Sequence, residues 1–529
     1  MAVLSTTPSA GTIAIASLAL YIAYRITSSL RLAARRRAII RDNNCQPAVD
    51  LDALPGRQEA VNRYWPWDRM FGFNLSNPKS VSDLLDQHRF YPSRMELWAA
   101  VAPTKTCTTQ MLNKRWTLTQ DVENVKYVMA TDFDNWAFTP GREHGLGQFL
   151  GKGIFTTDGA AWARSRNLVK PNFTRFQISN MALFERHLQQ LLAVLPRDGS
   201  TVDLSPLFFC MTMDIATEFL FGSSSETQGK GIDEEFSNAF GYCQDYALFL
   251  VRLGRLGSLL PYPKKFRRAR KLVHDFVDGY VDDALEKKRR FGDVKQDASE
   301  KGRYVVLQEL VQETSDREQL RSESLAVLLA GRDTTASTLT TLWFILALYP
   351  EVWTKLQAEV ATLDGQHPSF EQLKELKYLQ AVINEVLRLW APVSLNSRIC
   401  LADRVLPRGG GPDGSSPLFM PKGSQLGWVL YAYHRQRDIW GEDAEEFRPE
   451  RWLGERAMRF GWHYTPFNAG PRICLGQQFA LSQVGYVTVR LCQVFEGIEL
   501  RGRLREWREN SSLIISHSEG ATVSLKIRE

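Results

Sequence analysis

The chain has 529 residues, of which 44% are hydrophobic and 23% charged, proportions typical of globular proteins and not of disordered or many-spanning membrane proteins. Its 65 Lys and Arg residues against 59 Asp and Glu leave a net charge of +6, too small for this length to predict nucleic-acid binding. The 7 cysteines show no CxxC pair or zinc-ligand spacing, which argues against a disulfide framework and indicates a reducing compartment.

An apolar segment lies at the N-terminus. Residues 1–24 carry no charged side chain, Gly11 to Tyr24 is strongly apolar, and arginines follow from Arg25 to Arg37. About 20 apolar residues span a bilayer as a helix, and arginines after a span are retained in the cytosol. We therefore expect one N-terminal transmembrane helix with a cytosolic catalytic domain. A cleaved signal peptide is disfavoured because no positive charge precedes the apolar run.

The rest of the chain reads as one unit. A polar stretch with Pro47 and Pro55 follows the arginines and indicates a short hinge. No long linker or internal repeat is visible beyond it. The expected organisation is a membrane anchor at 1–30, a basic, proline-containing hinge at 31–60, and one large domain at 61–529.

Helical periodicity dominates the centre of the chain. Helices are predicted at 204–221, 275–291, 317–348, 351–363 and 370–390. The segment 317–348 is unusually long and apolar on most sides, so it should run through the middle of the protein. Strand-like sequence at 391–430 and 496–527 predicts small sheets at one side of a mainly α fold. The glycine-rich stretch 408–416 lacks the context of a phosphate-binding loop and is expected to be a turn between short strands.

The motif PFNAGPRICLG near the C-terminus carries the strongest chemical signal. Gly470 and Gly476 permit a tight loop whose backbone passes close to a flat macrocycle. Such a loop points N–H groups at the sulfur of Cys474 and stabilises a thiolate ligand to heme iron. Arg472 would pair with a heme propionate, and Phe467 would pack beneath the ring. A lone cysteine is otherwise more often a small buried hydrophobic residue.

At this loop the sequence resembles the cytochrome P450 superfamily, whose heme loop has Phe, Gly, Arg, Cys and Gly at the same spacing. The motifs AGRDTTA, GPDGSSPLFMPKG, WGEDAEEFRPERW and PFNAGPRICLGQQFA are most similar to the fungal microsomal subfamily that oxidises alkanes and fatty acids. The resemblance covers essentially the whole chain after the anchor. It implies the cytochrome P450 fold, heme b with Cys474 as the axial iron ligand, and a monooxygenase reaction.

The predicted central helix contains the motif AGRDTT. Gly331 in mid-helix costs about 1 kcal/mol relative to Ala, and a hydroxyl there can loosen the helical hydrogen bonds, so we expect a local opening that admits dioxygen. A glycine and a threonine in an ordinary packed helix are the alternative. The resemblance assigns Thr334 to hydrogen bonding the oxygen being activated and Asp333 to feeding protons from solvent. Arg332 is unusual in an apolar helix, and pairing with a neighbouring carboxylate explains it most simply.

A charged triad is expected to be structural. Glu385 and Arg388 stand three residues apart, so they share one helical face and can pair. The resemblance joins this pair to an arginine at the position of Arg451, in a triad that locks the fold and takes no part in catalysis.

Two further sites are implied by the resemblance alone. Trp162 and Arg166 match the family's WxxxR pattern, and Arg398 matches another position that contacts a heme propionate. For Arg166 and Arg398 an ordinary structural arginine is the alternative.

Electrons are expected to come from another protein, because the sequence shows no flavin, iron–sulfur or nicotinamide motif. The resemblance implies NADPH–cytochrome P450 reductase in the same endoplasmic reticulum membrane. Basic clusters at 264–271 and 287–290 could dock that reductase or anionic lipid, although a solvated face is an equal alternative.

The substrate is expected to be hydrophobic. The subfamily resemblance favours a long aliphatic chain, and the tailoring of a polyketide or terpenoid in fungal secondary metabolism is the alternative. A heme-binding sensor without turnover, or a heme-thiolate isomerase or dehydratase, is disfavoured because neither needs the proton relay of Asp333 and Thr334.

Overall fold

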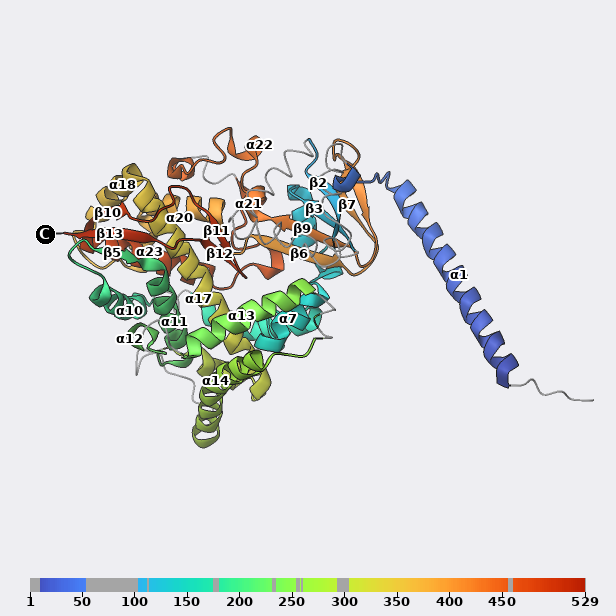
Figure 1. Cartoon of the computed structure of the whole chain (residues 1–529), viewed down its shortest axis with the longest axis horizontal. Helices are drawn as coiled ribbons and strands as arrows, with labels where there is room; N and C mark the ends of the chain where they lie inside the picture. The colour runs from blue at the N-terminus through green and yellow to red at the C-terminus, as the bar shows by residue number, and fades with distance from the viewer. Residues whose placement is uncertain are drawn as a thin grey trace, which may run out of the picture.

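The computed structural model describes residues 10–53, 103–111, 114–174, 180–230, 235–253, 257, 260–292, 304–454 and 460–528. A mostly helical body carries small sheets at two opposite sides, not at one side as predicted, and one helix extends away from it (Figure 1). This arrangement confirms the predicted mainly α class.

The helices of the described residues form most of the body. In chain order they are α1 (Ala10–Asp42), α6 (Val122–Lys126), α7 (Pro140–Leu150), α8 (Gly159–Val169), α10 (Met181–Val194), α11 (Leu204–Phe221), α12 (Thr227–Lys230), α13 (Glu235–Leu253), α14 (Lys264–Phe291), α16 (Val306–Glu313), α17 (Arg317–Leu348), α18 (Pro350–Ala361), α19 (Phe370–Glu375), α20 (Lys377–Trp390), α21 (Leu430–Tyr433), α22 (Arg437–Trp440) and α23 (Gln477–Val494).

The core is built around α17. Asp316 caps this helix by accepting hydrogen bonds from the N–H groups of Glu318 and Gln319, and most side chains after the first turn are buried. Helices α11, α14, α20 and α23 pack against it. The predicted bounds of α11 and α17 are confirmed. The predicted helix 370–390 is two helices, because Leu376 (ψ 86°) leaves the helical conformation between α19 and α20.

The strands form small sheets. They are β1 (Val49–Asp50), β2 (Thr106–Met111), β3 (Lys114–Thr119), β4 (Trp136–Ala137), β5 (Thr201–Asp203), β6 (Leu395–Cys400), β7 (Arg404–Gly410), β8 (Ser416–Met420), β9 (Gln425–Val429), β10 (Phe495–Leu500), β11 (Glu509–Ser511), β12 (Ile515–His517) and β13 (Thr522–Ile527). One sheet has the order β1-β2-β3-β9-β6-β4, another the order β10-β13-β5, and β7–β8 and β11–β12 are hairpins. The predicted strand regions are confirmed, and the glycine-rich stretch is the turn between β7 and β8.

Helix α1 projects from the side of the body that holds β2, β3 and β7 (Figure 1). Its 33 residues correspond to a length of about 50 Å. Near its C-terminal end, the Arg36 guanidinium donates two hydrogen bonds to the Asp403 carboxylate, at 3.0 and 2.9 Å. The helix continues past the predicted anchor boundary at residue 30 to Asp42, because the arginines that follow are good helix formers, and the boundary itself stays a prediction. The predicted hinge also contains strand β1, which pairs in parallel with β2.

Within the described residues, one helix, α11, is long and apolar enough to cross a bilayer, but 72% of it is buried inside the body. It is therefore a core helix. The predicted N-terminal transmembrane helix is not confirmed by this criterion.

Candidate active site

The loop that carries Cys474 is closely packed. It lies between the short helix η9 (Gly470–Arg472) and α23, and the Cys474 N–H donates to the Phe467 carbonyl at 3.0 Å. Gly470 has φ +64°, and a Cβ there would lie 2.1 Å from the carbonyl oxygen of Met129, so only glycine fits. Gly476 differs from the prediction, because its φ of −87° needs no glycine and a Cβ would make only ordinary contact with Phe173.

Cys474 is a free cysteine whose thiol is influenced by burial and by neighbouring groups. The residue is exposed, yet burial raises the pKa of its thiol. The N–H of Gly476 and the charge of Arg166 act in the opposite direction and lower that pKa. Arg166 itself donates to the Ile473 carbonyl at 3.0 Å. A metal that binds this sulfur would displace the proton, and the two groups would stabilise the resulting thiolate.

Three arginines surround the ring of Phe138 and form what we call the arginine cluster. The guanidinium carbons of Arg142, Arg398 and Arg472 lie 4.0, 4.6 and 4.2 Å from the ring centroid. They come from α7, β6 and η9, segments distant in sequence. The structure therefore brings the predicted Arg398 and Arg472 together and adds Arg142, which was not predicted.

The arginine cluster has more positive charge than its neighbours compensate. Burial lowers the pKa of Arg398 to about 9, with further lowering by the charges of Arg472 and Arg142. Within the described residues, Asp158 is the carboxylate that raises the pKa of all three, and Arg472 donates to it at 2.5 Å. Within the described residues the positive charges thus outnumber the carboxylate, and the charge of Arg166 also acts on Arg472. That surplus fits a ligand with two carboxylates, such as the propionates of heme.

Trp162 and Arg166, predicted as a pair, contact different parts of the site. The buried Trp162 ring packs 4.4 Å from the Arg472 guanidinium carbon and so supports the arginine cluster. Arg166 contacts the Cys474 loop instead. The Arg166 guanidinium carbon also lies 5.8 Å from the Trp162 ring centroid, and its charge lowers the pKa of both Cys474 and Arg472, so Arg166 acts on the cysteine loop and on the arginine cluster.

One face of α17 is only half-buried. Val327, Ala330, Gly331 and Thr334 form this face, whereas most other positions around them are buried. The Thr334 hydroxyl donates to the Ala330 carbonyl at 2.8 Å. The predicted local opening of the helix is wrong: α17 is continuous, because this hydroxyl adds a second bond to the carbonyl without displacing the helix.

Arg332 and Asp333 form an ion pair beside this face, with Nη1 and Oδ1 3.1 Å apart. The prediction that Arg332 pairs with a neighbouring carboxylate is confirmed. Arg332 also donates to the Ser237 hydroxyl at 3.1 Å, which links α17 to α13. Burial raises the pKa of Asp333, and the Arg332 charge lowers it.

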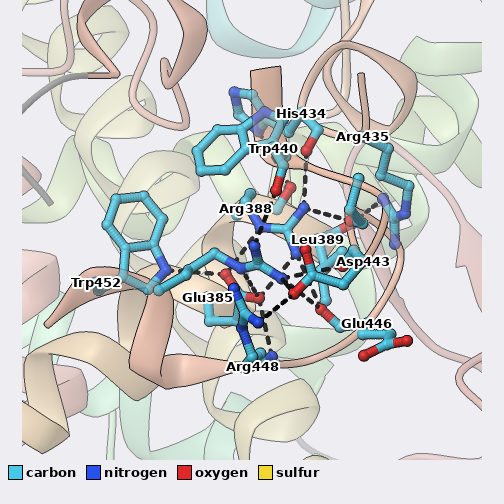
Figure 2. Close-up of polar contacts among 12 residues, drawn as sticks. Glu385, Arg388, Leu389, His434, Arg435, Trp440, Asp443, Glu446, Arg448 and Trp452 are labelled. Carbon is cyan, nitrogen blue, oxygen red and sulfur yellow. Dashed lines mark hydrogen bonds and ion pairs between the residues drawn. The ribbon is translucent and has the colours of Figure 1, made fainter. Parts of the chain in front are cut away.

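Glu385, Arg388 and Arg451 form a fully buried network, which we call the Glu385 network (Figure 2). Glu385 Oε1 lies 2.8 Å from Arg388 and 2.7 Å from Arg451. The indole N–H of Trp452 and the backbone N–H of Arg448 also donate to Glu385, at 2.9 and 3.0 Å. Arg388 donates further to three backbone carbonyls, and Asp443 Oδ2 lies 3.4 Å from Arg451, so a second carboxylate faces the second guanidinium group.

Comparison with known proteins identifies the family. Residues 98–524 match the family model "Cytochrome P450". A cytochrome P450 monooxygenase of Aspergillus japonicus, himC, is 40% identical over 479 residues, which cover 90% of this chain and 85% of the relative. The monooxygenase fsdH of Fusarium heterosporum is 39% identical over 526 residues, covering 97% and 88%. Cytochrome P450 52A3-B of Candida maltosa is 41% identical over 431 residues, covering 77% and 81%.

The cysteine loop and the arginine cluster therefore belong to a chain whose family is known. Members of this family carry heme b and incorporate oxygen into their substrates. The chain belongs to the cytochrome P450 family and is a heme-dependent monooxygenase supplied with electrons by a separate reductase.

Proposed function

We propose that this enzyme inserts one oxygen atom of O2 into a C–H bond of a long aliphatic chain. In that reaction O2, two electrons, two protons and the C–H bond give a hydroxyl group and one molecule of water. The observation that carries the proposal is Cys474, held on a loop that requires glycine at position 470 and lying near an arginine cluster with a surplus of positive charge. When bound through this cysteine, heme supplies the activation of O2.

The remaining site residues receive roles from their positions. Arg142, Arg398 and Arg472 bind the two propionates, and Trp162 supports Arg472. Thr334 presents its hydroxyl on the half-buried face of α17, and Asp333 on the same turn holds a proton for it. The Glu385 network locks the fold and takes no part in the chemistry.

The choice of an aliphatic substrate follows from the motifs that resemble the alkane- and fatty-acid-oxidising subfamily. Three relatives with different names share 39–41% identity with this chain, so overall identity does not select the substrate. The tailoring of a polyketide or terpenoid is the second candidate. It is kept because the himC and fsdH proteins align over more of the chain than the 52A3-B protein does.

We further propose that α1 anchors the enzyme in the endoplasmic reticulum membrane, with the body in the cytosol beside NADPH–cytochrome P450 reductase. Large apolar side chains along α1 support this proposal, because they are exposed outside the body; they are Ile15, Leu18, Leu20, Tyr21, Ile22, Tyr24, Ile26, Leu30 and Leu32. The arginines at 31–41 follow that stretch on the side expected to face the cytosol.

The proposal is tested with the purified full chain, its reductase and NADPH. The carbon monoxide complex of the reduced protein should show the red-shifted Soret band of thiolate ligation, and Cys474→Ser should abolish both the band and turnover. Fatty acids and alkanes, supplied in parallel with polyketide and terpenoid substrates, should give hydroxylated products of the first group. Product only from the second group would select the tailoring function instead.

A further inference from the structure

The junction between α1 and the body is closely built. Helix α1 ends in a Schellman motif, in which the Cys45 N–H donates to the Ile40 carbonyl at 2.8 Å and the Asn44 N–H donates to the Arg41 carbonyl at 3.1 Å. Asn44 adopts the left-handed conformation that is typical of this motif, with φ +51°. Residues 46–48 alone separate this cap from strand β1.

The β7–β8 hairpin holds this short link. The Gln46 N–H donates to the Pro417 carbonyl at 3.0 Å, and the Gly411 N–H donates to the Pro47 carbonyl at 2.9 Å. Ala48 is buried in a hydrophobic cluster that also contains side chains of β7 and β8. The chain after α1 is therefore bonded to the hairpin at two points and packed against it at a third, so the link is not a loose hinge.

The glycines of the hairpin leave room for that link. A Cβ on Gly410 would lie 2.4 Å from the Gln46 carbonyl oxygen and 2.5 Å from that of Pro417, so a side chain there would push one of them away. Gly411 has φ +81°, and a Cβ there would lie 2.9 Å from Gln46 Oε1. The glycine-rich stretch 408–416 was expected only to form a turn. It also forms the surface on which the chain after α1 rests.

A second contact joins the last turns of α1 to the body. Arg36 Nε and Nη2 donate to the two carboxylate oxygens of Asp403, a bidentate pairing that fixes direction as well as distance. The Lys422 N–H donates to the same carboxylate at 2.7 Å, and the hydrogen bond from Arg36 together with that of Lys422 lowers the pKa of Asp403. Ala33 and Ile39, one turn on either side of Arg36, are partly covered and belong to the face of α1 that meets the body.

We propose that Asp403 and residues 409–417 form a socket for the end of α1, the anchor socket, and that it holds the body at one angle to the membrane. The inference rests on the proposed function, because it takes α1 to be the membrane anchor. Leu32 ends the exposed apolar stretch of α1 one turn before Arg36, about 6 Å along the helix axis. The anchor socket therefore lies at the level of the lipid headgroups.

Two substitutions break the anchor socket from opposite sides. Arg36→Gln removes the bidentate donor from α1, and Asp403→Asn removes its partner while keeping an oxygen for the Lys422 N–H. Arg37→Gln is the matched control, because it removes the same charge from an exposed position on the same turn of the helix. Gly410→Ala displaces the link after α1 and serves as a further break if either substitution prevents folding.

The angle is measured as a distance, in the full chain in phosphatidylcholine nanodiscs. Spin-labelled unnatural amino acids replace Ser28 on α1 and Glu442 after α22, both exposed positions, so that the native cysteines stay unlabelled. Double electron–electron resonance should give one narrow distance distribution for wild type and for Arg37→Gln. Arg36→Gln and Asp403→Asn should widen it several-fold, because the body then samples many angles. Equal widths in all these chains, or equal widening in Arg37→Gln, would overturn the inference.

Two further readouts separate the ways in which the inference can fail. The double variant of Arg36→Gln and Asp403→Asn should widen the distribution no more than either single variant, because both remove the same contact, and additive widening would contradict the pairing. All variants should keep the wild-type Soret band and float with phosphatidylcholine vesicles. A wild-type chain that floats but gives a broad distribution would overturn the inference alone, whereas one that does not float would overturn the proposed membrane anchor as well.

Discussion

The Glu385 network and the arginine cluster both withdraw arginines from water, but they differ in how the charge is compensated. In the Glu385 network, the carboxylates of Glu385 and Asp443 and several backbone carbonyls satisfy both guanidinium groups. In the arginine cluster, three guanidinium groups share Asp158 and repel one another. A saturated network needs nothing further, so it is structural. The arginine cluster keeps an excess of positive charge, so it can still bind an anion, and the two carboxylates of heme would suit it.

The largest expected effect is on the Glu385 network. Glu385→Gln leaves Arg388 and Arg451 buried without their counter-charge, and breaking a buried ion pair in this way costs about 3–5 kcal/mol. The variant should accumulate poorly, and any soluble protein should unfold at a much lower urea concentration than wild type. Unfolding at the wild-type urea concentration would show that the network is not a lock.

Removing one arginine of the arginine cluster should weaken heme binding but stabilise the protein that lacks heme. Arg398→Gln removes one charge-assisted contact to heme, worth about 1.5–3 kcal/mol, so heme affinity should fall by about tenfold or more. Without heme, the same substitution relieves repulsion by Arg472 and Arg142, so the free energy of unfolding should rise. Heme titration and urea unfolding of both forms measure the two effects.

The control for that experiment is Arg164→Gln, which removes an exposed charge from α8. It should leave both quantities near their wild-type values. Equal destabilisation of the Arg398→Gln protein with and without heme would contradict the assignment of the arginine cluster to a ligand.

Sequence reasoning reached what is encoded locally and missed what depends on distant packing. The cysteine loop and the bounds of α17 were predictable, because motif and periodicity lie in contiguous residues. Arg451 lies 66 positions from Glu385, and only the family resemblance could join them. Arg142 was missed, because its approach to Arg398 arises when α7 meets β6. The continuity of α17 at Thr334 was also missed, since a hydroxyl can donate to a helix carbonyl without breaking the backbone hydrogen bond to it.

The pair of Arg332 and Asp333 is a third buried charged site. Its effect should appear in the pH dependence of product formation. Arg332→Gln removes the positive charge that lowers the pKa of Asp333, while burial still raises it. The folded-state pKa therefore rises, and Asp333 remains a protonated donor to higher pH. The alkaline limb of the pH–rate profile should move to higher pH, with little loss of stability because the buried carboxyl neutralises.

Two variants frame that result. Asp333→Asn should lose the alkaline limb altogether, because an amide cannot exchange the proton. Ser237→Ala removes only the second contact of Arg332 and should leave the limb where it is in wild type. A limb that moves to lower pH in Arg332→Gln would contradict the assigned charge effect.

The smallest expected effect belongs to an exposed ion pair whose acid, like that of the Glu385 network, is a glutamate. Glu450 and Lys355 lie 2.6 Å apart, with side chains 40% and 55% exposed. Because water solvates both partners once they separate, Glu450→Gln should change the free energy of unfolding by about 0–1 kcal/mol. Urea unfolding alongside Glu385→Gln isolates burial as the variable, since the substitution is the same. If the two variants lost equal stability, exposure would not be what separates a structural lock from an ordinary ion pair.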